Sequence, residues 1–183
     1  MAPVLSSFRP FAFPPFRLSV RLAILTISDA GHRGERADTS GDAIAAWGKE
    51  RGYTLAAREL VPDETGPIVA ALAAWADAEA ADLILTTGGT GLTARDVTPE
   101  ATRAVLDKEA PGIAEALRMA AYPRFPRAAL SRGVAGVRAR TFIVNLPGSP
   151  GGVRDGLAVL NDLVEHAVEL VRGDRTAHTE ESP

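Results

Sequence analysis

The sequence predicts an α/β fold in which a mostly parallel β-sheet is covered by helices on both faces. Short apolar runs rich in β-branched residues alternate along the chain with longer segments whose apolar residues recur at helical spacing. The apolar runs are continuous rather than alternating with polar residues, which is typical of strands buried on both faces. Residues that form turns, chiefly Gly, Pro and Asp, follow these runs.

The predicted elements alternate between strand and helix along most of the chain. We expect strands over residues 21–27, 53–61, 83–87 and 141–146. We expect helices from the cap residues 38–41 to Gly52, over 67–78, from Thr98 onward, over 111–119 and over 153–171. The basic segment 124–140 is expected to be irregular. This alternation is the basis for predicting parallel strands.

Length and composition indicate one globular domain. The chain has 183 residues, of which 46% are hydrophobic and 23% are charged, as in ordinary globular domains. We predict a single domain over residues 21–173, an extended arm over 1–20, where prolines oppose a helix, and a polar tail over 174–183. The absence of cysteine excludes disulfides and thiolate metal sites, and it fits a reducing, cytoplasmic compartment.

The charge distribution limits the classes of partner. A net charge of −3 gives no overall attraction to nucleic acid, and no apolar run is long enough to span a membrane, so we expect neither as a partner. Residues 95–140 contain nine basic and five acidic side chains, which makes this part of the chain locally basic. These basic residues either bind an anionic ligand or are scattered over a solvated face, and their number does not separate the two alternatives.

Polar and glycine-rich residues follow four of the predicted strands. They are Ser28 with Asp29, Asp63, the segment 88–96, and the segment 145–148. In parallel sheets that are covered on both faces, ligands bind beyond the carboxyl ends of the strands. We therefore expect these four segments, distant in the sequence, to meet at one edge of the sheet and form a site.

The segment 86–91 has the composition of an anion-binding loop. Gly88, Gly89 and Gly91 lack side chains that would keep a ligand away, and backbone N–H groups can point at phosphate oxygens. No lysine follows in the pattern of a Walker loop, and the spacing of a dinucleotide-binding loop is absent. A tight structural turn explains the glycines alone equally well.

An arginine, a carboxylate and a predicted helix start follow this loop at Arg95, Asp96 and Thr98. Arg95 can neutralise phosphate oxygens, and Asp96 can hold Mg²⁺ through a carboxylate oxygen. An internal Arg–Asp pair that caps the helix is the alternative. Asp63 is either a second magnesium ligand or a turn residue, and two acids in one pocket would favour metal-dependent chemistry.

Two further segments add polar side chains. Ser131 and Arg132 supply a hydroxyl and a cation suited to a phosphorylated or polar heterocyclic ligand. Asn145, close to Pro147 and Gly148, either reads the edge of a purine or pterin with its amide or forms a turn. The three histidines lie far apart and have no ligand spacing, so we assign them no metal or catalytic role.

Together these motifs resemble the MogA/MoaB-like molybdopterin-binding family, which includes the G domain of gephyrin. The resemblance extends from about residue 24 to about residue 170. The matching segments are 26–29, 38–41, 61–64, 86–91, 95–102, 130–133 and 145–150. The Gly-Gly-Thr-Gly block at 88–91 and the Arg-Asp-Val-Thr-Pro block at 95–99 are its most specific parts.

The resemblance implies a three-layer α/β domain that is usually a homotrimer and sometimes a hexamer. It implies a molybdopterin adenylyltransferase, which joins the AMP of Mg·ATP to the phosphate of molybdopterin, releases pyrophosphate and supplies a MoeA-type insertase. By motif position we assign catalysis and Mg²⁺ to Asp63 and Asp96, and phosphate neutralisation to Arg95. We assign molybdopterin to Ser131, Arg132 and Ser28, and the nucleotide to Gly88, Gly89, Thr90, Gly91, Asn145 and Gly148.

Two other functions share these motifs. A non-catalytic molybdopterin-binding or scaffold protein of the MoaB type would keep the same segments, although retention of Asp63 and Asp96 favours the enzyme. A CinA-type nucleotide-processing domain ranks third, because such domains tend to have a second acid where Arg95 stands. Residues 30–37 differ from the family's Arg- and Tyr-containing form, so we assign no ligand contact there.

Overall fold

The structure, a computed structural model, describes residues 19–173. The tail predicted over 174–183 lies outside the described residues, as does most of the arm predicted over 1–20. The last arm residues are part of the fold, because Val20 is fully buried and its carbonyl accepts a hydrogen bond of 2.9 Å from the N–H of Thr54. The folded unit therefore begins earlier than the predicted boundary at residue 21.

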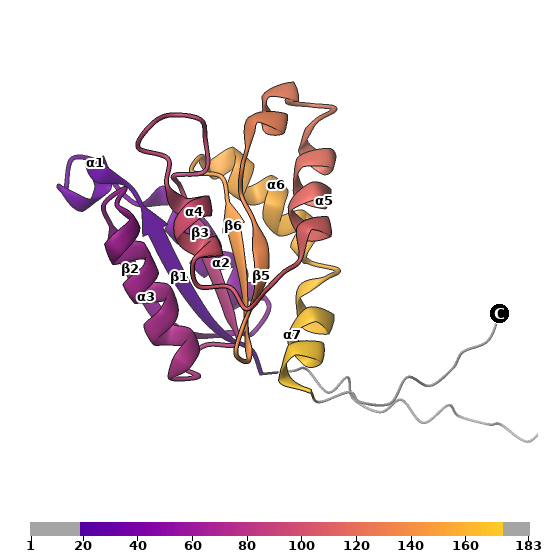
Figure 1. The fold of residues 1–183 in the computed structure, drawn as a ribbon. Coiled ribbons are helices and arrows are strands. Elements are labelled where there is room, and N and C mark those ends of the chain that lie inside the picture. Colours follow the sequence, from indigo (N-terminus) through magenta and orange to yellow (C-terminus); the bar gives the residue numbers. More distant parts are fainter. Residues whose placement is uncertain (1–18, 174–183) are drawn as a thin grey trace, which may run out of the picture.

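Within residues 19–173, a six-stranded sheet with the order β2-β1-β3-β6-β5-β4 forms the middle layer (Figure 1). The strands are β1 (Arg21–Ile27), β2 (Thr54–Val61), β3 (Leu83–Thr87), β4 (Lys108–Glu109), β5 (Ala135–Arg138) and β6 (Thr141–Leu146). Strands β2, β1, β3 and β6 are parallel, whereas β5 and β4 pair antiparallel. The predicted, mostly parallel sheet is confirmed, with a short antiparallel extension.

Helices cover both faces of this sheet and complete a three-layer α/β architecture (Figure 1). One face carries α2 (Thr39–Glu50), α5 (Pro111–Ala121), α6 (Pro150–Leu160) and α7 (Val164–Arg172). The other face carries α3 (Thr65–Asp77) and α4 (Thr98–Arg103). A single-turn helix, α1 (Asp29–His32), follows β1, and a 3₁₀ helix, η1 (Pro126–Leu130), follows α5.

Side chains of the central strands point alternately into two apolar layers. On β1, Leu22 and Ile24 belong to the layer beneath α2, α6 and α7, whereas Ala23 and Leu25 belong to the layer beneath α3 and α4. Successive side chains of a strand point to opposite faces, so a strand covered on both sides must be apolar throughout. This explains why the sequence shows continuous apolar runs.

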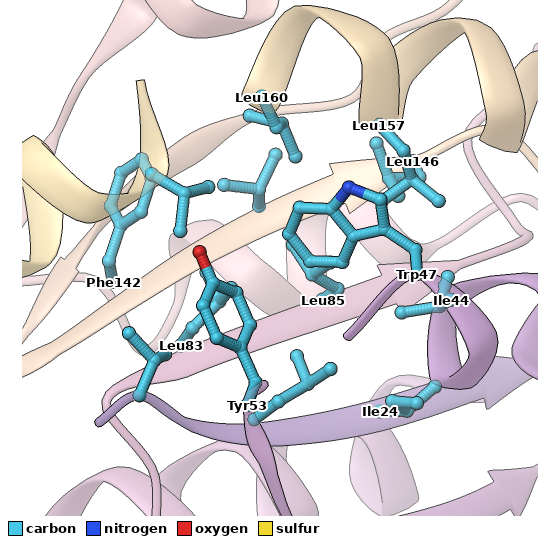
Figure 2. Packing of buried hydrophobic residues seen from close by; sticks show 14 of the residues in the cluster. Ile24, Ile44, Trp47, Tyr53, Leu83, Leu85, Phe142, Leu146, Leu157 and Leu160 are labelled. Atoms are coloured by element: carbon cyan, nitrogen blue, oxygen red, sulfur yellow. The ribbon is translucent and has the colours of Figure 1, made fainter. Parts of the chain in front are cut away.

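An aromatic pair fills the first of these layers (Figure 2). The rings of Trp47 and Tyr53 meet edge to face, with centroids 5.4 Å apart and planes at 88°. The indole N–H of Trp47 donates a hydrogen bond of 2.8 Å to Oδ1 of Asn161. Trp47 is thus a core residue whose polar atom is satisfied inside the protein.

Asn161 also marks an interruption that the sequence did not indicate. One continuous helix was expected over 153–171, but α6 ends at Leu160 and α7 begins at Val164. The guanidinium of Arg51 donates to Oδ1 of Asn161 at 2.9 Å and to its backbone carbonyl at 3.1 Å. These contacts, together with the bond from Trp47, hold the interruption against α2, so the prediction of one helix is wrong although the apolar spacing was correct.

The segment 124–140, expected to be irregular, contains η1 and β5. Strand β5 has only four residues and includes Gly136, which is a poor strand former. A Cβ at Gly136 would lie 2.3 Å from the carbonyl oxygen of Lys108 on β4, so this pairing requires glycine. Gly136 thus permits the close pairing of β5 with β4, and the same glycine makes the segment look unlike a strand in the sequence.

A buried carboxylate anchors the amino end of the sheet. Asp82, only 2% exposed, accepts hydrogen bonds from the N–H of Arg21 and from its Nη2, both at 2.7 Å, and from Nε of Arg172 at 3.0 Å. Burial alone would raise the pKa of Asp82, but the bonds from the two arginines outweigh burial and lower this pKa to about 2. The ionised form is therefore built into the fold.

We expect Asp82→Asn to reduce the free energy of unfolding at pH 7 by about 2 kcal/mol, because the lowered pKa corresponds to that much stabilisation of the charged form. The contribution of Asp82 is complete above its unfolded pKa and is lost as pH falls through about 2. Urea unfolding at pH 7 and at low pH measures both effects. The matched variant Asp77→Asn removes an exposed pair with Arg138 and should cost less than about 1 kcal/mol; equal losses would contradict the anchoring role.

Candidate functional site

The carboxyl ends of the parallel strands meet at one edge, where α1, the loop between β3 and α4, and the start of α6 lie together (Figure 1). The N–H of Ser28 donates to the carbonyl of Val61 at 2.9 Å, and the N–H of Asp29 donates to Oδ2 of Asp63 at 2.7 Å. The Oγ1 of Thr87 donates to the carbonyl of Pro147 at 2.7 Å. The four polar segments predicted to converge are therefore brought together.

Two adjoining cavities open at this edge. The first, which we name the acidic cavity, has a volume of about 490 Å³, and its lining includes Asp38, Asp63 and Asp96. The second, which we name the apolar cavity, has a volume of about 460 Å³, and side chains of α5 and η1 form much of its wall. Ser149 lines both cavities. The edge thus offers a polar compartment next to an apolar one.

The predicted site residues divide between these cavities. Ser28, Asp63, Gly88, Gly89, Asp96 and Gly148 line the acidic cavity; Thr90, Gly91, Ser131 and Asn145 line the apolar cavity; Arg95 and Arg132 line neither. Ser28, expected on the molybdopterin side, therefore lies beside glycines expected on the nucleotide side. The division by ligand that the motifs suggested does not coincide with the division by cavity.

The glycine loop between the cavities depends on backbone conformations that favour glycine. Gly88 has φ of 101° and Gly89 has φ of 61°. A Cβ at Gly88 would lie 2.1 Å from the carbonyl oxygen of Ile27 on the neighbouring strand. Thr98, at the start of α4, donates from Oγ1 to the carbonyl of Gly88 at 2.9 Å and from its N–H to the carbonyl of Gly89 at 3.1 Å. The loop is thus both a tight turn and part of the cavity wall.

Asp63 and Asp29 hold each other in place at the ends of β2 and β1. The N–H of Asp29 binds Oδ2 of Asp63 at 2.7 Å, and the N–H of Asp63 binds Oδ1 of Asp29 at 3.0 Å. Burial raises the pKa of Asp63 and the bond from the N–H of Asp29 opposes that rise. The negative charges of Asp29 and Asp96 raise this pKa further, whereas the positive charge of Arg95 lowers it. The carboxylate of Asp63 is therefore fixed in position and crowded by negative charge, which favours binding of a cation.

Asp96 is held in its ionised form at the wall of the same cavity. Its Oδ2 accepts a hydrogen bond of 2.8 Å from the N–H of Thr93. Burial raises the pKa of Asp96, but hydrogen bonds from Thr93 and Gly91 and the charge of Arg132 outweigh it and lower the pKa. Asp96 is therefore an anion at neutral pH.

The two carboxylates fit magnesium by donor type and number. Among residues 19–173, no three His, Cys, Asp or Glu side chains gather into a metal cage. Mg²⁺ in phosphoryl-transfer sites is held by one or two carboxylates and completes its shell with waters and substrate phosphates, so it needs no such cage. Asp63 and Asp96 line one cavity and feel each other's charge, as a shared ion requires.

Arg95 and Arg132 line neither cavity and are paired within the chain. Arg95 binds both carboxylate oxygens of Asp29, at 3.0 and 2.8 Å. Arg132 donates to the carbonyl of Gly91 at 2.6 Å, to the carbonyl of Asp96 and to the carboxylate of Glu100. Their guanidinium groups have partners within the chain and stabilise the walls of the site, and their assignment to a ligand stays a prediction.

The basic residues of the longer segment 95–140 follow the same pattern. Five of its nine cations form ion pairs with carboxylates of the described chain. These cations are Arg95, Arg103, Arg124, Arg132 and Arg138. The interpretation of this segment as scattered, internally paired charges is therefore favoured over a single anion-binding cluster.

The amide of Asn145 is used inside the protein. Its Nδ2 donates to Oγ1 of Thr86 at 2.9 Å and to Oγ1 of Thr102 at 3.0 Å, and its Oδ1 accepts from the N–H of Val134 at 3.1 Å. The residue is only 3% exposed. Both amide donors are thus occupied within the protein, where Asn145 joins β3, α4 and β6 beneath the apolar cavity. The assignment of Asn145 to the nucleotide stays a prediction.

Most of the chain matches a known protein family. Residues 23–166 match the profile described as "Probable molybdopterin binding domain". The chain belongs to the molybdopterin-binding family. The resemblance stated from the motifs is thereby confirmed, and the matched segment contains the carboxylates of the acidic cavity and the glycine loop.

Relatives in this family share the fold over nearly its full length. The chain is 38% identical over 160 residues to a protein named molybdopterin adenylyltransferase from Helicobacter pylori J99, covering 85% of this chain and 90% of that one. The crystal structure of MoaB from Thermus thermophilus matches with a TM-score of 0.80 and 55% identity, covering 84% of this chain and 97% of that chain.

Some relatives are much longer. The protein cinnamon from Drosophila melanogaster, described as a molybdenum cofactor synthesis protein, is 40% identical over 167 residues, and the matched part is 28% of its length. This chain therefore corresponds to one part of that protein. No helix within residues 19–173 combines the length and the apolar character needed to cross a bilayer.

The structure also identifies site residues that sequence reasoning missed. Asp29 had been noted only as a polar strand end, yet it ties Asp63 to Arg95. Arg36 lines the acidic cavity although no contact was assigned to residues 30–37. No local signal marks Arg36, because it reaches the cavity only when the loop after α1 folds back.

Proposed function

We propose that this chain is a molybdopterin adenylyltransferase. The observation that carries the proposal is the placement of Asp63 and Asp96 on one cavity, next to an apolar cavity, at the carboxyl edge of the sheet. A reaction between two phosphorylated heterocycles needs a compartment for phosphates beside one for a flat ring. The name of the H. pylori relative, which matches over 90% of its length, supports the same reaction.

In the proposed reaction the terminal phosphate oxygen of molybdopterin attacks the α-phosphorus of ATP. A new P–O bond forms there, the bond from the α-phosphorus to the oxygen bridging to the β-phosphorus breaks, and that oxygen leaves with pyrophosphate. Both reactants are anionic, so positioning and charge neutralisation matter more than proton transfer. We assign the phosphates to the acidic cavity with Ser28, Gly88, Gly89 and Gly148.

The pterin is assigned to the apolar cavity, with Ser131 and the Thr90–Gly91 backbone as polar contacts. Leu117 and Phe125 give this cavity apolar walls of the kind that bind flat rings. Ser149 lines both cavities, which suits it to the junction between the two reactants.

Asp63 and Asp96 would hold Mg²⁺, and the ion would neutralise charge on the phosphates of ATP. The bonds from the N–H groups of Asp29 and Thr93 orient these carboxylates before a ligand arrives. We also propose a homotrimer or hexamer, a cytoplasmic location where ATP is present, and a MoeA-type insertase as the acceptor of the product.

The test is pyrophosphate release by the purified chain with molybdopterin and Mg·ATP. We expect turnover that requires both substrates and is abolished by removal of Mg²⁺. Binding of molybdopterin without pyrophosphate release would favour the alternative, a non-catalytic molybdopterin-binding protein. A coupled phosphate assay after pyrophosphatase treatment measures the rate, and binding is measured separately by isothermal titration calorimetry.

A further inference from the structure

The acidic cavity is proposed to bind anionic phosphates, yet most of its charged side chains are negative. Its charged lining consists of three carboxylates, Asp38, Asp63 and Asp96, and one cation, Arg36. Asp38 is already paired, because Nη2 of Arg58 lies 2.7 Å from its Oδ2. Arg95, the expected neutralising cation, and Arg132 line neither cavity and bind partners within the chain. Arg36 is therefore the cation that remains for a bound anion.

The loop after α1 places Arg36 at this cavity. The N–H of Gly34 donates to the carbonyl of Gly31 and the N–H of Glu35 to the carbonyl of Ala30, both at 2.9 Å. Gly34, with φ of 74°, provides the left-handed residue that the reversal requires. The loop thus folds back over α1 and returns residue 36 to the end of β1.

The guanidinium of Arg36 is weakly held within the described part of the chain. Its Nη2 lies 3.3 Å from Oγ of Ser28, and it forms no ion pair with a carboxylate of residues 19–173. Ser28 itself lines the cavity and accepts a bond from the N–H of Gly31 at 3.1 Å. An exposed arginine with one long hydrogen bond keeps most of its five donors available for phosphate oxygens.

We propose that Arg36 binds the phosphate chain of the nucleotide in the acidic cavity and so sets the affinity for pyrophosphate-containing ligands. The proposal rests on the proposed function, since it names the residue that binds the leaving group of that reaction. A planar guanidinium can bind two phosphate oxygens at once, and it would face the same anion as a magnesium ion held by Asp63 and Asp96. The loop after α1, to which the sequence assigned no ligand contact, would thereby supply one.

Arg33 provides a matched control within the same loop. It is also an exposed arginine, but its Nε and Nη2 bind the carboxylate of Glu35 at 2.8 and 2.9 Å, and it lines neither cavity. Arg33→Gln and Arg36→Gln remove the same charge from neighbouring positions. A general effect of net charge would change both variants equally.

The experiment is calorimetric titration of the whole chain with inorganic pyrophosphate, with and without Mg²⁺, for the wild type, Arg36→Gln, Arg36→Lys and Arg33→Gln. We expect Arg36→Gln to weaken binding by about tenfold or more, which is the scale of a charge-assisted hydrogen bond. Arg36→Lys should bind more tightly than Arg36→Gln, because lysine keeps the positive charge but lacks the planar guanidinium that binds two oxygens at once. Arg33→Gln should bind as the wild type does, and thermal unfolding should be the same for all variants.

Equal affinity of Arg36→Gln and the wild type would overturn the proposal, as would the absence of any pyrophosphate binding by the wild type. An equal loss in Arg33→Gln would also overturn it, because the effect would then be one of net charge. Turnover with molybdopterin is measured separately. If affinity depends on Arg36 while no adenylyl transfer occurs, the proposed function fails and the role of Arg36 in binding stands.

Discussion

Replacing Asp96 by Asn is expected to lower kcat for pyrophosphate release by about 100-fold to 1,000-fold, the usual scale for removing one charge-stabilising group from an active site. The substitution keeps the size and the bond from the N–H of Thr93 but removes the negative charge that a shared Mg²⁺ requires. Steady-state rates over a range of Mg²⁺ concentrations measure the effect, with part of the activity returning at high Mg²⁺ if the ion is held less tightly.

The control for this prediction is Asp77→Asn, which removes an exposed carboxylate of α3 that lines neither cavity. Its turnover should equal that of the wild type. Calorimetry with molybdopterin should show little change in Asp96→Asn, since the pterin is assigned to the apolar cavity. Unchanged turnover in Asp96→Asn would refute the proposed metal role of this residue, whatever the outcome for the other assignments.

Replacing Gly88 by Ala is expected to reduce the free energy of unfolding by at least about 3 kcal/mol, a loss typical of severe backbone conflicts. The added Cβ would meet the carbonyl oxygen of Ile27 at 2.1 Å, and no side-chain rotation can relieve contact with backbone. The φ of 101° adds conformational strain. Thermal and urea unfolding measure the loss, and separation of β3 from β1 would also deform the acidic cavity.

Gly34→Ala separates the backbone collision from the strain of a positive φ. Gly34 has φ of 74°, but a Cβ there meets no atom within 4 Å, so this variant carries strain without a collision. We expect a loss of about 1 kcal/mol, the usual cost of placing alanine in the left-handed region. If both variants lost the same stability, the close packing of Gly88 against β1 would contribute nothing, and its role in fixing the glycine loop would be wrong.

The sequence predicted the parts of this molecule that depend on local patterns. Continuous apolar runs located β1, β3 and β6, because strands buried on both faces leave no other composition possible. The rule that ligands bind at the carboxyl edge then placed Asp63 and Asp96 together, and they line one cavity. Strand β5, which lies between β6 and the edge strand β4, escaped prediction, since a four-residue strand containing Gly136 has no pattern to read.

What the sequence could not supply was the choice of partner for each charged side chain. Arg95 was expected to neutralise phosphates and Arg132 to bind molybdopterin, but Arg95 binds Asp29 and Arg132 binds the carbonyl of Gly91. Arg36 received no role, although the fold leaves it without a carboxylate partner among residues 19–173 at the cavity. Such pairings depend on distances across the sheet edge, where residues far apart in sequence compete for the same cation.

Two reciprocal hydrogen bonds between Asp29 and Asp63 couple the carboxyl ends of β1 and β2. Neither backbone segment can shift alone, because moving one breaks a bond made by its own amide and a bond made by its own carboxylate. Arg95 binds both carboxylate oxygens of Asp29, so a displacement of this exposed guanidinium would shift Asp29 and, through the reciprocal bonds, Asp63. The carboxylate of Asp63 is thus sensitive to events on the outer surface of the loop that follows β3.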